Sequence, residues 1–251
     1  MALKVCSIAS GSKGNCIYVS SGKTELVIDL GINYNRADKL IREKGGSGIK
    51  NILLTHCHSD HFSNVPAALE RGATLYYQAR CKSDLAGICG DAVEKAGMFE
   101  IDDIRVIPFN LSHDSACVGY KLICGGSKIS IVTDSGYLSG ENMDIIRDSG
   151  LVVLESNYDK TMLANNKRYP VWLKQRITGT EGHLSNESAA EAVWQLAASG
   201  VKKIMLAHLS EHNNTPALAF RASQEQLSRR NLNVKLTVAT QRSASEILEV
   251  D

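Results

Sequence analysis

The chain has 251 residues, a hydrophobic content of 43%, a charged content of 22% and a formal net charge of +1. These values are ordinary for a globular protein with a sizeable core. They exclude a strongly basic surface, so any affinity for nucleic acid must come from a local patch. No apolar run reaches the 18 residues of a membrane span, and no secretory signal is evident. We therefore expect a cytoplasmic protein without a membrane partner.

The order of the predicted elements indicates an α/β protein, with residues 1–251 forming one domain. Short runs of β-forming residues between turns predict strands at residues 4–9, 17–20, 25–29, 51–54, 73–77, 105–109, 118–123, 128–133, 151–154, 203–207 and 234–238. Helical patterns cover residues 36–44, 66–71, 188–199 and 216–230. The sequence contains no internal repeat, low-complexity segment or linker.

The most informative segment is Thr-His-Cys-His-Ser-Asp-His at residues 55–61, directly after the predicted strand 51–54. It holds three imidazoles and one carboxylate, and side chains on a tight loop can point in different directions. We expect His56 and His58 to bind one ion while Asp60 and His61 face a second. Imidazole with carboxylate favours zinc, manganese or iron over calcium or magnesium.

Three further candidate ligands also follow predicted strands. They are His113, Asp134 and His208. Taken singly, each is more simply read as an ordinary polar residue that is satisfied by the protein. Strand ends on one edge of a sandwich converge on one cleft, so together with the segment above they predict a metal site.

In their order along the chain, these residues resemble the five-motif signature of the metallo-β-lactamase superfamily. The resemblance implies an αββα sandwich, in which two mixed β-sheets are flanked by helices and carry a dinuclear metal site at one edge. It also implies a role for each residue: His56, His58 and His113 hold the first ion, Asp60, His61 and His208 hold the second, Asp134 bridges both, and Asp29 orients the ligand loop without binding an ion.

Two departures separate the chain from other branches of that superfamily. The commonest zinc β-lactamases have a cysteine ligand in place of an aspartate, and an arginine where His61 stands. Diiron oxygen or nitric-oxide reductases have a glutamate where His58 stands. An all-histidine and aspartate site implies the hydrolase branches, which include glyoxalase-type thioesterases, lactonases and phosphodiesterase nucleases.

Four segments favour a phosphodiester substrate. The Gly/Ser loop at residues 9–15 can offer N–H groups to a phosphate, the stretch 155–159 is polar throughout, and residues 182–186 precede a helix start. Residues 160–176 hold five basic side chains and no acid, interleaved with aromatic rings that suit nucleic acid. A plain hairpin turn and a solvated helix face are the alternative readings. From these segments we predict substrate contacts at Ser10, Asn15, Asn157, Arg168, Arg176, Ser185 and Asn186.

The motifs SGSxGN, ESNYD, RYPxWLKxRIxGxxGHLSN and AHLSxxNNTP, which lie between residues 7 and 216, resemble the YycJ/WalJ-type metal-dependent hydrolases. The resemblance implies a 5′-to-3′ exonuclease that acts on DNA rather than RNA, with a role in repair. A β-CASP insertion has no room here, because only residues 135–207 separate Asp134 from His208.

The expected mechanism uses two divalent ions, zinc or manganese with iron as a further choice, that share a hydroxide as nucleophile. Asp60 or Asp134 accepts a proton, and His183 contacts the scissile phosphate or protonates the leaving group. The alternative for His183 is a structural histidine at a helix cap. Two other functions remain open: a hydrolase of a cyclic phosphodiester, lactone or thioester, and a non-catalytic, metal-stabilised regulatory partner. The sequence does not specify an oligomeric state.

Overall fold

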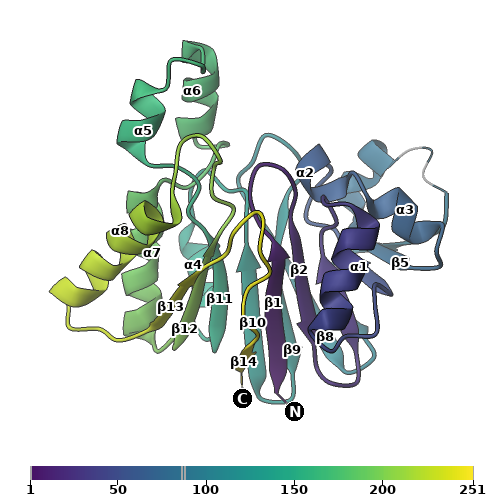
Figure 1. The fold of residues 1–251 in the computed structure, drawn as a ribbon. Coiled ribbons are helices and arrows are strands. Elements are labelled where there is room, and N and C mark those ends of the chain that lie inside the picture. The colour runs from purple at the N-terminus through teal and green to yellow at the C-terminus, as the bar shows by residue number, and fades with distance from the viewer. Residues whose placement is uncertain (1, 86, 88, 251) are drawn as a thin grey trace.

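Two seven-stranded β-sheets pack face to face in the computed structural model, which describes residues 2–85, 87 and 89–250 (Figure 1). The first sheet contains, in spatial order, β14 (Leu248–Val250), β1 (Leu3–Ala9), β2 (Cys16–Ser20), β3 (Glu25–Ile28), β4 (Asn51–Leu53), β5 (Thr74–Gln78) and β6 (Asp91–Lys95). The second contains β13 (Lys235–Val238), β12 (Lys203–Ala207), β11 (Leu151–Glu155), β10 (Ser127–Val132), β9 (Val118–Cys124), β8 (Ile104–Asn110) and β7 (Phe99–Ile101). Both sheets are mixed, since each joins parallel and antiparallel pairs.

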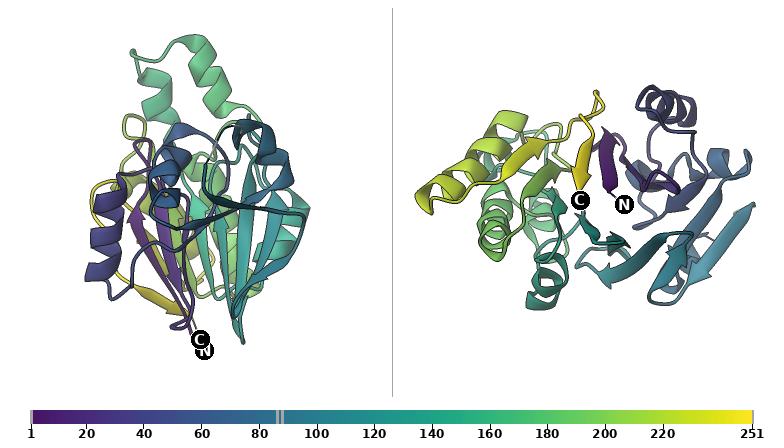
Figure 2. Two further views of the ribbon diagram at one scale, coloured as in Figure 1. Left: turned by 90° about the vertical axis from the view of Figure 1, so that its right-hand side faces the viewer. Right: turned by 90° about the horizontal axis from the view of Figure 1, so that it is seen from below.

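Helices cover the outer face of each sheet, because strands such as β11 are apolar on both faces and need cover on both (Figure 2). One buried cluster, which includes Val5 and Tyr120, fills the space between the sheets. The helices α1 (Tyr34–Glu43) and α3 (Val65–Leu69) bury a second cluster against the first sheet. The helices α7 (Asn186–Ser199) and α8 (Pro216–Arg229) bury a third against the second sheet. The predicted αββα sandwich is confirmed.

The remaining helices are short. They are α2 (Ser59–Phe62), the 3-10 helix η1 (Ala79–Leu85), α4 (Gly140–Ile146), α5 (Lys160–Asn165) and α6 (Val171–Thr178). The pair α5 and α6 projects beyond the strands, at the end where α2 lies (Figure 1). We call residues 160–178 the arm. No residue of α6 is buried, so the arm presents most of its surface to solvent. Among the helices of the described chain, none is both long and apolar enough to cross a bilayer.

Three strands are not predicted from the sequence: β6, β7 and β14. All three lie at edges of the sheets, where a strand pairs on one side only. They are short, and the β6 sequence Asp-Ala-Val-Glu-Lys carries charges, which is how natural proteins protect an edge strand. Their pairing is set by the neighbouring strand, so their own residues give little signal.

Candidate metal centre

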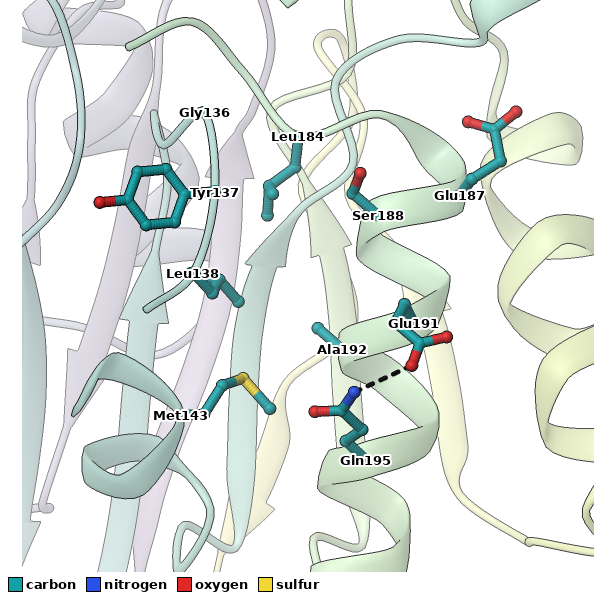
Figure 3. A pocket seen from close by; sticks show the side chains of 10 residues that line it. All are labelled: Gly136, Tyr137, Leu138, Met143, Leu184, Glu187, Ser188, Glu191, Ala192 and Gln195. Atoms are coloured by element: carbon teal, nitrogen blue, oxygen red, sulfur yellow. Dashed lines mark hydrogen bonds between the residues drawn. The ribbon is translucent and has the colours of Figure 1, made fainter. Parts of the chain in front are cut away.

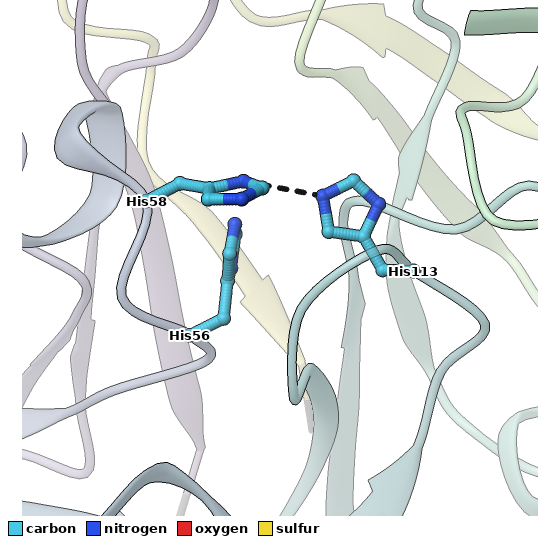
Figure 4. A group of neighbouring side chains, drawn as sticks. All are labelled: His56, His58 and His113. Carbon is cyan, nitrogen blue, oxygen red and sulfur yellow. Dashed lines mark hydrogen bonds between the residues drawn. The ribbon is translucent and has the colours of Figure 1, made fainter. Parts of the chain in front are cut away.

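The candidate ligands gather at one end of the sandwich, in the loops that follow β4, β8, β10 and β12. In each of four groups, the candidate ligand atoms lie within 4.8 Å of one another. The groups are His56, His58 and His113; His56, His61 and Asp134; Asp60, His61 and His208; and Asp134, Glu155, His183 and His208. Figure 4 shows the rings of the first group facing one another. The structure therefore brings together all seven side chains that the sequence predicts as ligands.

Three residues of the site have a left-handed backbone. The φ angles are 61° at Asp29, 62° at Asp134 and 56° at His208, and each residue follows closely on the end of a buried strand. This conformation costs a residue other than glycine on the order of 1–3 kcal/mol, and it persists where the surrounding structure fixes it. It turns the chain sharply as the strand ends, so the side chain enters the centre rather than continuing the sheet.

Asp29 and Thr55 orient two of the imidazoles. Asp29 Oδ2 accepts a hydrogen bond from Thr55 Oγ1 at 2.8 Å and lies 2.6 Å from His61 Nδ1. Thr55 gives its only hydroxyl hydrogen to Asp29, so it accepts one from His56 Nδ1, 3.0 Å away. Both rings therefore carry hydrogen on Nδ1. The Nε2 atom of each is the one available to a metal ion.

Acceptors from two other loops orient the rings of His113 and His58. His113 Nδ1 donates to the carbonyl of Gly182 at 3.1 Å, which leaves Nε2 as its ligand atom. His58 presents Nδ1 to that atom at 3.3 Å, while its Nε2 lies 3.4 Å from Asp114 Oδ1. A hydrogen bond thus holds one nitrogen of His113, while His58 has Asp114 beside one nitrogen and His113 beside the other. Metal-bound histidines in proteins have this arrangement.

Glu155, the last residue of β11, is fully buried and serves two histidines. Its Oε1 lies 2.9 Å from His208 Nδ1 and 2.8 Å from His183 Nδ1. Its Oε2 accepts from the backbone N–H groups of Ser135 at 3.0 Å and Leu184 at 3.1 Å. His183 and the strong ligand candidate His208 are therefore fixed by one carboxylate.

Two buried atoms of the cluster make no hydrogen bond with any described residue: His56 Nε2 and Asp134 Oδ2. Asp134 Oδ2 does lie 3.1 Å from His61 Nε2, as an ion-pair contact. A buried polar atom without a partner costs about 1–3 kcal/mol, and a cation among these atoms removes that cost. Imidazole nitrogens with carboxylate oxygens form a donor set for divalent transition metals. The residues present therefore fit a metal centre.

The charges of the cluster set the protonation of its histidines. Burial, followed by the neighbouring His61, holds the pKa of His56 well below its ordinary value, so His56 Nε2 keeps its lone pair at neutral pH. Burial opposes the charge on His208, but the carboxylates, Asp134 foremost, raise the pKa of His208 to about 10. Burial also opposes the charge on His61, but Asp134 and Asp29 raise the pKa of His61 well above its usual range. Without an ion, these two rings carry protons where an ion would bind.

Five of the seven predicted substrate contacts are buried and bonded to the protein. Ser10 Oγ accepts from the backbone N–H of His208 at 2.7 Å, and Asn157 Nδ2 donates to the carbonyl of the same residue at 2.8 Å. Asn15 Oδ1 accepts from the backbone N–H of Gly11 at 2.9 Å, and Asn15 Nδ2 donates to the carbonyl of Asp60 at 3.3 Å. We therefore place these three side chains in the support of the centre, because their polar atoms already have protein partners.

Ser185 and Asn186 are also inside the protein, at 1% and 2% exposure. Ser185 is the N-cap of α7. The Asn186 side chain bonds with Ser156 at 2.7 Å and with Asn214 at 2.8 Å. Neither side chain reaches the surface, so the predicted contact with substrate is withdrawn for both.

The two arginines of the prediction lie on the arm and are exposed. Arg176 forms an ion pair with Asp114, the same carboxylate that lies beside His58 Nε2. Arg168 makes no ion pair within the described part of the chain. Its backbone N–H donates to Asn166 Oδ1 at 2.9 Å.

The sequence pattern assigns no individual role to Glu155, Asp114 or Thr55, although each supports the centre. A signal for Glu155 is present in the sequence, because it ends an apolar strand. Asp134 and His208 likewise lie within two residues of the end of a strand. Asp114 and Thr55 adjoin predicted ligands in sequence, and only the fold shows which ring each one holds.

Comparison with known proteins gives one family. Residues 9–77 match the model of the metallo-β-lactamase superfamily. Exodeoxyribonuclease WalJ of Streptococcus pneumoniae is 33% identical over 249 residues, which cover 93% of this chain and 91% of that protein. Exodeoxyribonuclease YycJ of Bacillus anthracis is 31% identical over 245 residues, covering 93% and 92%.

Solved structures agree in fold at lower identity. The metallo-β-lactamase fold protein YhfI of Bacillus subtilis superposes with a TM-score of 0.75 at 16% identity, over 99% of this chain and 100% of that one. Zinc-bound PqqB of Methylobacterium extorquens gives 0.74 at 15% identity, over 98% and 100%. Identities this low bear on the fold alone.

Proposed function

The chain belongs to the metallo-β-lactamase superfamily and is a metal-dependent hydrolase, and we propose that it is an exonuclease that shortens DNA from the 5′ end. The names of its two exodeoxyribonuclease relatives support the proposal. We further propose that residues 1–251 act as one hydrolase domain without a β-CASP insertion. The segment between Asp134 and His208 supports this, since sheet strands, covering helices and the arm occupy it.

The observation that carries the proposal is the orientation of the imidazoles, each with one nitrogen held by a protein acceptor and the other facing the cluster. In this proposal one divalent ion is held by His56, His58 and His113, a second by Asp60, His61 and His208, and Asp134 lies between them. Zinc or manganese suits these donors. Such ions, when bound, stabilise charge on a phosphodiester and lower the pKa of water.

His183 is placed to give a proton to the leaving 3′-oxygen. Its ring lies between those of His113 and His208, with centroids 5.2 Å and 5.5 Å away, and its side chain is 20% exposed. Burial disfavours its charged form, but Glu155 and then Asp134 raise the pKa of His183. A general acid needs this shift, because it must hold its proton at neutral pH.

Asp60 and Asp134 are the candidate proton acceptors. Burial opposes their ionisation, yet the neighbouring histidines hold the pKa of both carboxyls well below the usual range. Both are therefore ionised at neutral pH. Water attack at phosphorus then breaks the bond to the 3′-oxygen: a carboxylate takes one proton from the water, His183 supplies one to the 3′-oxygen, and a 5′-phosphate stays on the retained strand.

The arm is the proposed grip on DNA. Its basic side chains include Arg168 and Arg176, and Val171 and Trp172 are 70% and 65% exposed. Basic side chains beside an exposed aromatic ring suit a phosphate backbone with stacked bases. The ion pair of Arg176 with Asp114 joins the arm to the metal centre. A DNA substrate would place the enzyme in the cytoplasm, in a process such as repair.

The test is to incubate purified protein, with manganese and separately with zinc, on a 5′-phosphorylated duplex that is labelled at its 3′ end. We expect progressive shortening from the 5′ end, absent in His58→Ala protein, which serves as the control for contaminating nucleases. Hydrolysis of bis-p-nitrophenyl phosphate without cleavage of DNA or of matching RNA would instead indicate a small phosphodiester substrate. A folded protein that cleaves neither would favour a regulatory role.

A further inference from the structure

Tyr137 divides two hollows beside the metal centre. It follows Asp134 by three positions, and its side chain is 49% exposed. Its backbone is held, because Ser135 Oγ donates to the carbonyl of Tyr137 at 2.7 Å, and Gly136 N–H donates to the carbonyl of Ser112 at 2.9 Å. Ser112 in turn precedes His113. The backbone that carries the ring is therefore fixed between two loops that carry candidate metal ligands.

The first hollow, of about 380 Å³, lies between Tyr137 and α7 (Figure 3). Leu184 and Ala192 line it, and the carboxylates of Glu187 and Glu191 stand along α7 at its side. Two acids there repel a polyanion such as DNA. Its described lining residues include no buried polar side-chain atom without a partner.

The second hollow, of about 670 Å³, is lined by a single acid among the described residues, Glu141, and does contain such an atom. This volume is within the roughly 300–1,000 Å³ of small-ligand sites. Gln78 lines it with only 9% of its surface exposed, and Gln78 Nε2 has no hydrogen-bond partner among the residues described. Phe109 and Tyr137 add aromatic walls, and Arg80, bonded to the lining residue Asn110 at 2.5 Å, brings a positive charge to this side.

We propose that the second hollow binds a nucleobase of the strand whose phosphodiester lies at the metal centre, and the proposal rests on the exonuclease function proposed above. Gln78 Nε2 donates to an acceptor on the base, which removes the cost of a buried unpaired donor. The Tyr137 ring lies against the base. A nucleobase fits because it is planar, has acceptors along its edge, and is attached to a phosphate that the neighbouring centre receives.

The test uses DNA substrates that carry an abasic site at one of the first four 5′ positions. At one position, loss of the base should raise the KM of the wild type about fivefold or more, the magnitude of one lost base–aromatic stack. In Tyr137→Ala and Gln78→Leu, the KM values for the intact and the abasic substrate should become nearly equal. In Gln78→Leu the ratio of kcat/KM for DNA to that for bis-p-nitrophenyl phosphate should fall about three- to tenfold.

Gln195→Leu, a glutamine of the first hollow, is the matched control and should keep the wild-type discrimination. Thermal unfolding and metal content show whether each variant is folded and loaded. If the wild type cuts intact and abasic DNA equally at every position, the base site is overturned and the exonuclease stands. If no DNA is cut, the proposed function fails, and the base site is then tested by NMR titration with dTMP. Chemical-shift changes that occur in the wild type and disappear in Gln78→Leu would still support the base site. The absence of such changes in the wild type would overturn it.

Discussion

Replacing Glu155 by glutamine tests how the fold selects the ligand nitrogen of a histidine. The substitution keeps the size of the side chain and removes its charge. The amide oxygen can stay with the backbone N–H groups of Ser135 and Leu184, which Glu155 Oε2 accepts at 3.0 and 3.1 Å. The amide NH₂ then replaces Oε1 and meets two imidazole N–H donors, those of His183 and His208.

The magnitude follows from this geometry. Each lost hydrogen bond to the charged acceptor contributes about 1.5–3 kcal/mol. His208 can relieve the clash of donors by moving its hydrogen to Nε2, but that atom faces Asp60 and is its candidate ligand atom. We expect the affinity of the ion at His208 to fall about 10- to 100-fold, as for other residues that hold metal ligands. The ion at His56, His58 and His113 should be retained, because Glu155 bonds to none of these rings.

The assay is zinc content at buffered free zinc, together with the tautomer of His208 read from NMR of ¹⁵N-labelled imidazoles. Glu155→Gln should lose one class of site, and its His208 should lack the hydrogen on Nδ1 that the wild type directs at Glu155. Glu187→Gln is the matched control, since that glutamate lies on α7 with its side chain 52% exposed. Two ions bound by Glu155→Gln with wild-type affinity would refute the reasoning.

Three further predictions concern charge. Arg168→Glu should raise the KM for DNA and reduce the slope of log KM against log salt by about 0.7–0.9, the value for one lost phosphate contact. Arg229→Glu is the control, because Arg229 lies on α8 with its side chain 69% exposed, and it should change neither quantity. Burial opposes ionisation of Asp148, but Lys121 and Lys128 hold the pKa of Asp148 below its ordinary value of 3.8. The ionised carboxylate therefore stabilises the folded protein above that pH, and this contribution is lost as the pH falls. Asp148→Asn should thus lower the free energy of unfolding in urea by about 1 kcal/mol at pH 7, a small value because the side chain is 49% exposed, and equal losses at pH 7 and pH 2 would contradict this. Zinc binding to metal-free protein at pH 7 should release protons, since the pKa of His208 is raised to about 10; calorimetry in two buffers of different ionisation enthalpy measures the release, and equal heats in both would count against it.

The metal cluster could be predicted because its signal is local. His56, His58, Asp60 and His61 lie within six positions after an apolar strand, and the other candidate ligands also follow strands. The run of short apolar segments predicted an α/β protein with many strands, whereas the αββα sandwich was implied by the resemblance to the metallo-β-lactamase superfamily. The convergence of candidate ligands needs only short-range patterns and the rule that strand ends meet at one edge.

Apart from Asp29, whose role the family resemblance implied, the support of the centre could not be predicted, because it depends on pairs that are distant in sequence. Ser10 bonds to His208 across 198 positions, and Asn15 reaches His61 across 46. A serine or asparagine in a Gly/Ser loop has the same local pattern whether it faces a phosphate or a buried histidine. The fold decides between the two, and here it directs both side chains inward.

Several features of the centre oppose folding, and contacts within the centre offset them. Asp29, Asp134 and His208 have left-handed backbones, each costing on the order of 1–3 kcal/mol, and Asp134 and Glu155 are buried carboxylates. Protons on the rings of His61 and His208 balance part of this charge without an ion. These protons lie on nitrogens that face the cluster, while the opposite nitrogens stay bonded to Asp29 and Glu155. The rings that would hold an ion are thus oriented by Asp29 and Glu155.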